Sequence, residues 1–215
     1  MSDTPATVFD LALAQLAIGD YAPIRFEYKA TIEGLVRQYL YEDGVKVTTF
    51  RNAFKRAVQE GFYPAFEQGL TDGGSEPPAV EDDLDWINAK AAAEWGFVDM
   101  LFQQLKELKA LAKVEGYQIL EGVAEARAEG YARGLDAVYA EGKIRGAKNQ
   151  MLWFGGEDGE ESCKECQKLK GKKHRASWWV KHGLIPGQRG NGNFSCGGWN
   201  CQHYLYNSKG EVFTV

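Results

Sequence analysis

Residues 195–203 read SCGGWNCQH, and residues 161–174 read ESCKECQKLKGKKH. These two stretches contain all four cysteines of the 215-residue chain, spaced as C-x2-C, then 29 residues, then C-x4-C-x-H. Each short spacing can place two thiolates on one metal ion, and Zn²⁺ takes thiolate ligands in tetrahedral geometry. A Gly-rich segment with few aliphatic side chains can fold around such an ion instead of a large apolar core. The pattern therefore predicts a small C-terminal module stabilised by one structural Zn²⁺.

The expected ligands are Cys163, Cys166 and Cys201, with the fourth supplied by either Cys196 or His203. The C-x-H spacing at 201–203 leaves this last choice open. The other two histidines, at positions 174 and 182, are expected to be surface or core residues.

The start of the chain bears on the alternative, in which the cysteines form disulfides. The N-terminal stretch MSDTPATVFDLALAQLAIGDY has no basic flank, and Asp10 and Gln15 interrupt it. No run approaches the roughly 18 apolar residues of a membrane span. We therefore expect neither a signal peptide nor contact with a membrane. In a cytosol, clustered cysteines are more often metal ligands than disulfides.

Charge and composition change near residue 151. Residues 1–150 carry 16 Lys and Arg against 24 Asp and Glu, a net charge of −8, whereas residues 151–215 carry 9 against 6, a net charge of +3. The composition changes there from Ala, Glu and Leu to Gly, Cys, Trp and Lys. We expect a Cys/Gly/Trp-rich module at 151–215, with its hinge near Phe154.

Most of the chain before this boundary has helical periodicity. Apolar residues recur at steps of three and four in residues 1–70 and again in residues 84–150, as amphipathic helices require. Residues 71–83, TDGGSEPPAVEDD, combine turn formers with acidic side chains and predict a flexible linker. The expected fold class is thus mainly α: an elongated helical N-terminal region followed by a small, irregular α+β module.

Glycines punctuate the second helical region. A single helix over residues 84–150 would be about 100 Å long, so we expect a break, preferably at Gly116. Gly122, Ala126 and Gly130 could form a row of small residues that lets another helix approach closely; the alternative is a loosely specified, bent helix. Tyr117 and Tyr131 are expected on exposed stripes of these helices.

The stretch KECQKLKGKKHR at 164–175 has six basic residues against one Glu. Such a surface can contact phosphates, or it can be the solvated face of a small domain. The candidate nucleic-acid contacts are Lys168, Lys170, Lys172, Lys173 and Arg175. The adjacent Trp178 and Trp179 are expected first as core or interface anchors.

The order of these features resembles the C-terminal module of the phage Mu F-like (MuF) head morphogenesis family. The resemblance rests on a tryptophan, an acidic turn, C-x2-C, Leu-x-Gly and a closing Gly-Trp-Asn-Cys, which here are Trp153, Asp158, Cys163, Cys166, Leu169, Gly171 and Gly198 to Cys201. It covers about residues 150–205; the helical part agrees only in character. The family's closing motif ends in Arg-Cys, whereas this chain has Gln202 and His203, a difference that bears on the metal ligands.

The resemblance implies a structural role rather than an enzymatic one. Members of the family are minor capsid proteins of tailed phages that associate with the portal during head assembly, and some affect DNA ejection. The implied partners are therefore the portal protein, other head components and packaged DNA, with several copies in an assembly. The implied locations are the host cytoplasm during assembly and then the virion. No catalytic residue carries over from the family.

Two other functions remain open at this stage. Zinc-supported HNH nucleases have a similar order of residues, with His182 as general base, Asn193 orienting its loop and His203 binding a catalytic ion. Lys181 stands where those enzymes usually have His or Asp. A zinc-ribbon DNA-binding regulator would rest on the basic stretch alone.

Overall fold

The structure is a computed structural model that describes residues 21–77, 79–156, 162–188, 191–198 and 201–213. It is mainly helical and includes one small antiparallel sheet, which confirms the expected mainly α content. The chain divides into two compact units. One contains residues 23–64 and 79–135, and the other contains residues 65–78 and 136–215 together with the start of the chain. The part of the expected helical region 1–70 that precedes residue 21 lies outside the described residues.

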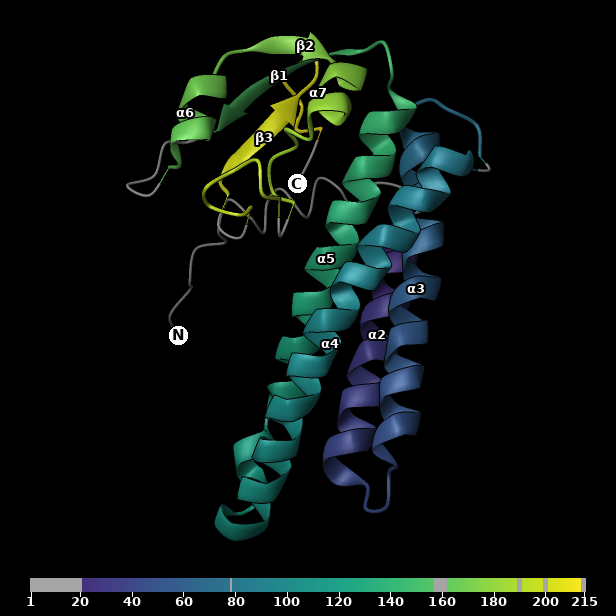
Figure 1. The fold of residues 1–215 in the computed structure, drawn as a ribbon, viewed down its shortest axis with the longest axis vertical. Coiled ribbons are helices and arrows are strands. Elements are labelled where there is room, and N and C mark those ends of the chain that lie inside the picture. Colours follow the sequence, from purple (N-terminus) through teal and green to yellow (C-terminus); the bar gives the residue numbers. More distant parts are fainter. Residues whose placement is uncertain (1–20, 78, 157–161, 189–190, 199–200, 214–215) are drawn as a thin grey trace, which may run out of the picture. The chain divides into compact units, whose positions relative to one another are not determined.

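The first of these units is a bundle of helical segments (Figure 1). It contains most of α2 (Tyr21–Tyr41), the first part of α3 (Val47–Asp72), α4 (Glu81–Glu115), the short 3-10 helix η1 (Tyr117–Leu120) and the first part of α5 (Val123–Gly146). Aromatic side chains pack the segments together. Tyr39 on α2 contacts Phe50 and Phe102, with ring centroids 4.8 and 5.3 Å away.

The expected linker at 71–83 is shorter in the structure, because helix occupies both of its ends. α3 continues to Asp72 and α4 begins at Glu81. The acidic residues 81–83 form the first turn of α4, where negative charge interacts favourably with the helix dipole. The Asp83 carboxylate also accepts a hydrogen bond from the Val80 backbone N–H, at 3.3 Å. Acidic side chains that suggested a linker therefore serve to start a helix.

The expected break at Gly116 is confirmed. α4 ends at Glu115, and Gly116 has φ of 104°, a conformation that residues with a Cβ rarely adopt. Of the two alternatives for Gly122, Ala126 and Gly130, a row of small residues against another helix is not what the structure has. Gly122 precedes α5 with φ of 72°, and a Cβ at Gly130 would meet nothing within 4 Å. Tyr131 is not on an exposed stripe either, since it packs edge-on against Phe54 with centroids 4.9 Å apart.

The close approach of two helices occurs elsewhere, in the second unit. Here Gly69 on α3 and Gly73, in the turn that follows α3, face Gly142 and Gly146 on α5. A Cβ at any of the four would clash with backbone atoms of the opposite helix. Two Gly-x3-Gly pairs therefore let the two backbones come into contact. The sequence of either segment alone does not predict this contact.

The same unit contains a three-stranded antiparallel sheet with strand order β2-β1-β3. The strands are β1 (Met151–Gly156), β2 (Lys173–Arg175) and β3 (His203–Tyr206). Two short helices, α6 (Lys164–Leu169) and α7 (Ala176–His182), lie along the chain before and after β2. In the strand register, Trp153 of β1 pairs with Lys173 of β2 on one side and with Tyr206 of β3 on the other.

One face of the sheet is the core of this unit. Leu152, Phe154 and Leu205 are fully buried there, as is Trp179 of α7. The Trp179 indole N–H donates to the Leu152 carbonyl at 3.3 Å, which ties α7 to β1. The expectation that Trp179 is a core anchor is confirmed.

Candidate metal centre

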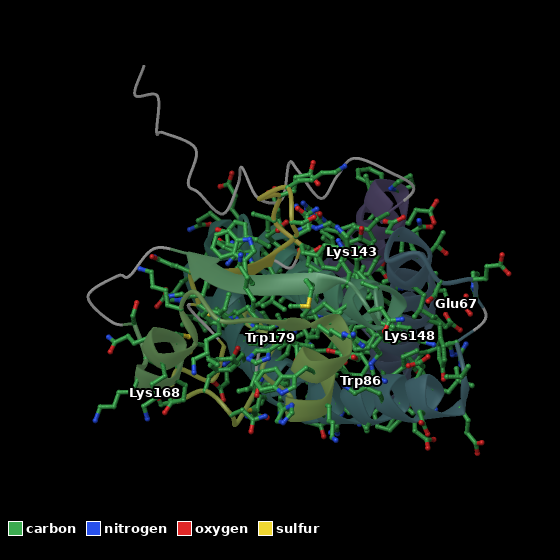
Figure 2. The ribbon with its side chains drawn as sticks, turned by 90° about the horizontal axis from the view of Figure 1, so that it is seen from above. Glu67, Trp86, Lys143, Lys148, Lys168 and Trp179 are labelled. Atoms are coloured by element: carbon green, nitrogen blue, oxygen red, sulfur yellow. The ribbon has the colours of Figure 1, made fainter. Side chains whose placement is uncertain are left out.

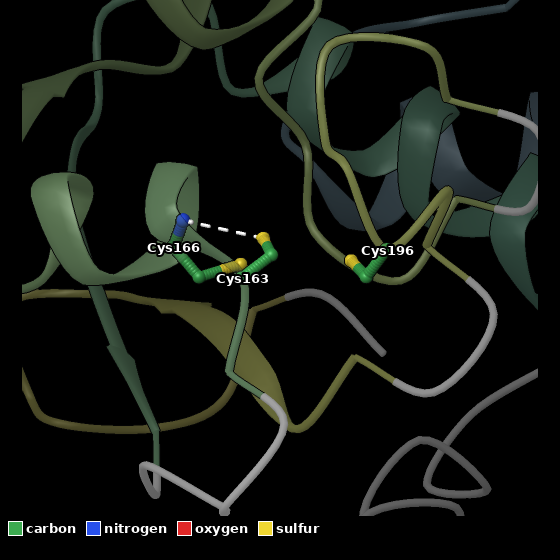
Figure 3. Close-up of side chains that lie close together, drawn as sticks. All are labelled: Cys163, Cys166 and Cys196. Atoms are coloured by element: carbon green, nitrogen blue, oxygen red, sulfur yellow. Dashed lines mark hydrogen bonds between the residues drawn. The ribbon is translucent and has the colours of Figure 1, made fainter.

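The C-x2-C stretch forms the start of α6. Cys163 is the N-terminal cap of this helix, and its sulfur accepts a hydrogen bond from the Cys166 backbone N–H at 3.5 Å (Figure 3). A cap and the third residue of a first helical turn lie on the same side of the helix end. The spacing of two residues therefore directs both sulfur atoms to one place.

The second cysteine stretch is a glycine turn that brings Cys196 to the same place (Figure 3). Gly197 and Gly198 have φ of 60° and 74°, so the chain reverses with no penalty from a Cβ. The Gly197 backbone N–H donates to the Phe194 carbonyl at 2.8 Å and closes the turn.

The two stretches are tied together by a contact that the sequence reading missed. The Glu165 carboxylate accepts hydrogen bonds from the Ser195 backbone N–H at 3.1 Å and from its hydroxyl at 2.7 Å. One signal was available in the sequence, because Glu165 is the single acidic residue between positions 162 and 210. An isolated carboxylate inside a basic segment is a candidate for a structural hydrogen bond.

Five side chains meet at this point, and we call them the thiol cluster: Cys163, Cys166, Cys196, Cys201 and His203. Their ligand atoms form two groups, one of Cys163, Cys166 and Cys196 and one of Cys166, Cys201 and His203, each with all separations within 4.8 Å. Cys166 belongs to both groups. The sulfur atoms of Cys166 and Cys201 are 3.9 Å apart, and all four cysteines are free thiols. The thiol cluster could therefore hold a metal ion.

His203 is part of the hydrophobic core as well as of the thiol cluster. Its side chain is buried, and its ring stacks on Phe154 with centroids 5.4 Å apart. Its backbone pairs with Gly156 across β1 and β3. The strand pairing and the stacking fix the position of this ring beside the two thiols.

The thiols differ in their tendency to ionise. The pKa of Cys201 is lowered to about 5, mainly because its sulfur accepts a hydrogen bond from the Cys166 thiol. Burial acts to raise this pKa, and hydrogen bonds with the backbone lower it further. The reciprocal interaction with Cys201, together with burial and the nearby Cys163, raises the pKa of Cys166. Burial acts to raise the pKa of Cys163, but hydrogen bonds from Cys166 and Cys196 lower it overall.

Burial and the nearby thiol of Cys163 raise the pKa of Cys196, the fourth thiol. Neighbouring sulfur atoms thus alternate between favoured and disfavoured ionisation, because negative charges so close together repel one another. A bound cation reverses this repulsion and favours deprotonation of every coordinating thiol.

The thiol cluster lies at the edge of the core. Cys166 is buried within the core, and Cys163, Cys196 and Cys201 pack against it. An ion bound here would connect the start of α6, the glycine turn and the start of β3. Such a position suits a structural metal rather than one that is open to a substrate.

The candidate nucleic-acid contacts are all exposed or at the surface of this unit. Lys168 lies on α6 and points away from the sheet (Figure 2). Lys170 and Lys172 lie on either side of the turn at Gly171, whereas Lys173 and Arg175 are on β2, an edge strand. They are spread over several elements, so no single short stretch of helix presents all of them.

The two remaining histidines flank Trp178. The Trp178 ring stacks on His174 with centroids 3.7 Å apart and on His182 with centroids 4.1 Å apart. His182 Nδ1 also lies 2.8 Å from the Trp178 carbonyl oxygen. In the described part of the chain, neither histidine belongs to a group of three or more metal-ligating side chains.

The residues that an HNH nuclease would use can be compared with their positions in the structure. The Asn193 amide donates to the Gly183 carbonyl at 3.1 Å and to the His182 carbonyl at 3.4 Å, so it does hold the backbone after α7. His203, however, lies among thiols, which are surroundings of a structural metal site rather than of an open hydrolytic one.

Comparison with known proteins adds no relative. No protein-family model matches this chain, and no curated protein or solved structure is significantly similar to it. Among the described helices, none is both long and apolar enough to cross a membrane. Asp158, Trp199 and Asn200, which contribute to the MuF-like pattern, lie outside the described residues.

Proposed function

We propose that the chain is a MuF-like minor head protein of a tailed phage or prophage, whose C-terminal module is stabilised by one structural Zn²⁺. The observation that carries this proposal is the thiol cluster, because it gathers every cysteine of the MuF-like pattern at one point. The function itself rests on the resemblance described above. The geometry supports it because the described residues of the motif lie together in one folded unit.

The distance between two thiols supports zinc. A tetrahedral site with Zn–S bonds of about 2.3 Å has sulfur atoms about 3.8 Å apart. Cys166 and Cys201 are separated by 3.9 Å, which requires little movement to bind the ion. A disulfide, by contrast, would need these atoms at about 2.05 Å.

The four cysteines are the proposed ligands, with His203 beside them. Two thiols come from each stretch, and the sulfur atoms of Cys163 and Cys196 lie within 4.8 Å of each other. His203 is already held by its stacking on Phe154 and by its place in β3. It packs against the site and serves as the alternative fourth ligand if Cys196 does not bind.

The other residues of the MuF-like pattern also belong to this module. Trp153 lies on β1, and Leu169 packs against the core. Gly171 has φ of 76°, and its backbone N–H donates to the Phe154 carbonyl at 2.8 Å. A glycine is needed at this turn, which connects α6 to the sheet. The spacing of the pattern is therefore compatible with one folded unit.

Assembly with a partner is the proposed mode of action. The helical unit exposes apolar side chains near the junction of α4 and η1: Val114 is 85% exposed and Tyr117 is 44% exposed. Tyr117 stacks on Tyr41, which is itself exposed. Exposed apolar groups of this kind are suited to burial against another protein, for which the resemblance suggests the portal.

Co-purification with the cognate portal protein tests this function. The tagged full-length chain should retain the portal, and V114E should weaken retention, whereas Q104E, the same change of charge at another exposed position of α4, should not. Virions of a phage lacking the gene should show defects in assembly or DNA delivery. Failure to associate with any head component, combined with cleavage of plasmid DNA in Mg²⁺ or Mn²⁺, would instead support the nuclease.

A further inference from the structure

The face of the sheet opposite the core combines aromatic and basic side chains. In an antiparallel pair, directly opposed residues project from the same face. Lys173, Trp153 and Tyr206 are opposed in register and therefore form one row across β2, β1 and β3. Arg175 and Met151 form the adjacent pair on that face, and both are exposed. We call these five residues the aromatic-basic face.

The two rings of this face are held in a defined arrangement. Trp153 and Tyr206 are stacked, with centroids 4.5 Å apart and an angle of 20° between their planes. The Trp153 indole N–H donates to the Asn207 carbonyl at 3.2 Å. Both rings lean over Gly155, where a Cβ would come within 2.5 Å of the Trp153 ring and 3.0 Å of the Tyr206 ring. A glycine thus leaves the space that the stacked pair occupies.

The stacked pair leaves one indole face toward the basic strand. Tyr206 covers the side of Trp153 nearer β3, so the other side is turned toward β2. Both rings are half-buried rather than enclosed. A further flat ring placed there would extend the stack and lie close to Lys173 and Arg175.

Basic side chains are concentrated around β2. Residues 162–210 contain nine Lys and Arg and one acidic residue, Glu165, within a module of net charge +3. The carboxylate of Glu165 is hydrogen-bonded to Ser195. Within the described ranges, no carboxylate forms an ion pair with Lys173 or Arg175. Both side chains are exposed.

We propose that the aromatic-basic face binds single-stranded nucleic acid, with a base stacked on Trp153 and the adjoining phosphates paired with Lys173 and Arg175. Stacking of bases on aromatic rings beside a basic groove is the general mode of single-strand binding. A duplex fits this face poorly, because its bases are already stacked inside the helix and cannot reach the indole ring.

A second explanation for the lysines makes different predictions. Basic side chains on an edge strand such as β2 discourage pairing with the edge of another sheet. In that case, replacing Lys173 would promote self-association and leave nucleic-acid binding unchanged. If this face instead binds a protein, Trp153 should be needed to capture that protein, and the chain should have no affinity for DNA.

Binding of the full-length chain to a labelled oligothymidylate tests the proposal, with fluorescence anisotropy measured over a range of salt concentrations. We expect saturable binding that is tighter than binding to a duplex of equal length. W153A should weaken it about tenfold, since loss of one stacked base typically costs that much or more. W153F retains a ring and should recover most of the affinity.

The basic residues are tested with matched charge changes. The double variant K173E/R175E should lower affinity and reduce the slope of log affinity against log salt by about 1.4, as expected for two lost phosphate contacts on a single strand. K164E/K168E makes the same charge change on α6 and should have a much smaller effect. Circular dichroism and zinc content confirm that each variant is folded.

Three outcomes would overturn the proposal: no saturable binding at moderate salt, equal affinity for duplex, or equal loss in the two double variants. If W153A does not fold, W153F and K173E/R175E still decide the matter. Single-strand binding does not require the chain to be a head component, so failure here leaves the portal experiment unaffected.

Discussion

The Glu165 carboxylate accepts two hydrogen bonds from Ser195, at 3.1 Å from the backbone N–H and at 2.7 Å from the hydroxyl. Glu165 stands between Cys163 and Cys166, and Ser195 immediately precedes Cys196. These hydrogen bonds lower the pKa of Glu165 to about 2, so it remains ionised at neutral pH. One carboxylate therefore connects the two halves of the thiol cluster.

Loss of this connection should weaken metal binding without removing a ligand. E165A should lose its zinc at a chelator concentration about tenfold lower than the wild type requires. A loss of affinity of this size is typical when a residue that positions metal ligands is removed. The measurement is competition with a coloured chelator at neutral pH. E165Q can still accept a hydrogen bond from the Ser195 hydroxyl and should be affected less.

S195A provides the reciprocal test, since it removes the hydroxyl donor and keeps the backbone N–H. It should fall between wild type and E165A. An E165A protein that retains zinc as tightly as the wild type would show that the two cysteine stretches do not need this tie.

The identity of the fourth ligand can be decided by two variants. With four thiolate ligands, C196S should lose most of the bound metal, whereas H203Q should keep about one zinc per chain. Substitution with Co²⁺ gives a second measurement, because its absorption spectrum distinguishes four sulfur ligands from three sulfurs and one nitrogen. A cobalt spectrum that changes in H203Q and is unchanged in C196S would assign the site to His203 instead.

The cysteine spacing predicted the thiol cluster because it is a local property of the chain. C-x2-C at a helix start directs two sulfur atoms to one side, and two glycines permit the turn before Cys201. The tie between Glu165 and Ser195 could not be predicted in the same way, because it joins residues that are 30 positions apart. The row of Lys173, Trp153 and Tyr206 likewise depends on strand register, which no periodicity in such short strands reveals.

The helices show the same division between local and distant information. Gly116 was predicted as a break because its cost inside a helix is a local property. The acidic residues 81–83 were assigned to a linker, since their polarity fits a loop as well as a helix N-terminus. The contact of Gly69 with α5 depends on which helices become neighbours, and the sequence alone does not distinguish Gly69 from Gly122 as the site of such a contact.

An ion-pair network in the helical unit should make the free energy of unfolding depend on pH. Glu129 on α5 lies 2.7 Å from Arg25 and 2.9 Å from Lys29, both on α2. Partial burial acts to raise the pKa of Glu129, but hydrogen bonds and charge interactions with the two cations lower it overall. A carboxylate with a lowered pKa stabilises the fold above its unfolded pKa, and this contribution is lost as the pH falls through its folded pKa.

Urea denaturation of wild type and E129Q at several pH values measures this contribution. At pH 7 the variant should be less stable by about 1 kcal/mol at most, because the pair is partly exposed to solvent. The difference should begin to shrink below about pH 4.5, where the carboxylate of the unfolded chain takes up its proton, and should be lost once the pH falls through the lowered pKa of the folded state. E33Q removes the carboxylate of an exposed pair within α2 and should show a smaller effect. A constant difference between wild type and E129Q down to pH 3 would contradict the ion-pair explanation.

The glycine contact between α3 and α5 leads to the sharpest prediction for stability. G142A introduces a methyl group against the Phe66 carbonyl and backbone, where the two helices have no space for it. Backbone atoms cannot move aside as a flexible side chain can, so we expect a loss of about 1–3 kcal/mol in the free energy of unfolding. G134A is the matched control on the same helix, because a Cβ there meets nothing within 4 Å. It should raise stability by up to about 1 kcal/mol through the higher helix propensity of Ala. Urea denaturation of the two variants should therefore shift in opposite directions, and equal shifts would show that the helices are not in contact at Gly142.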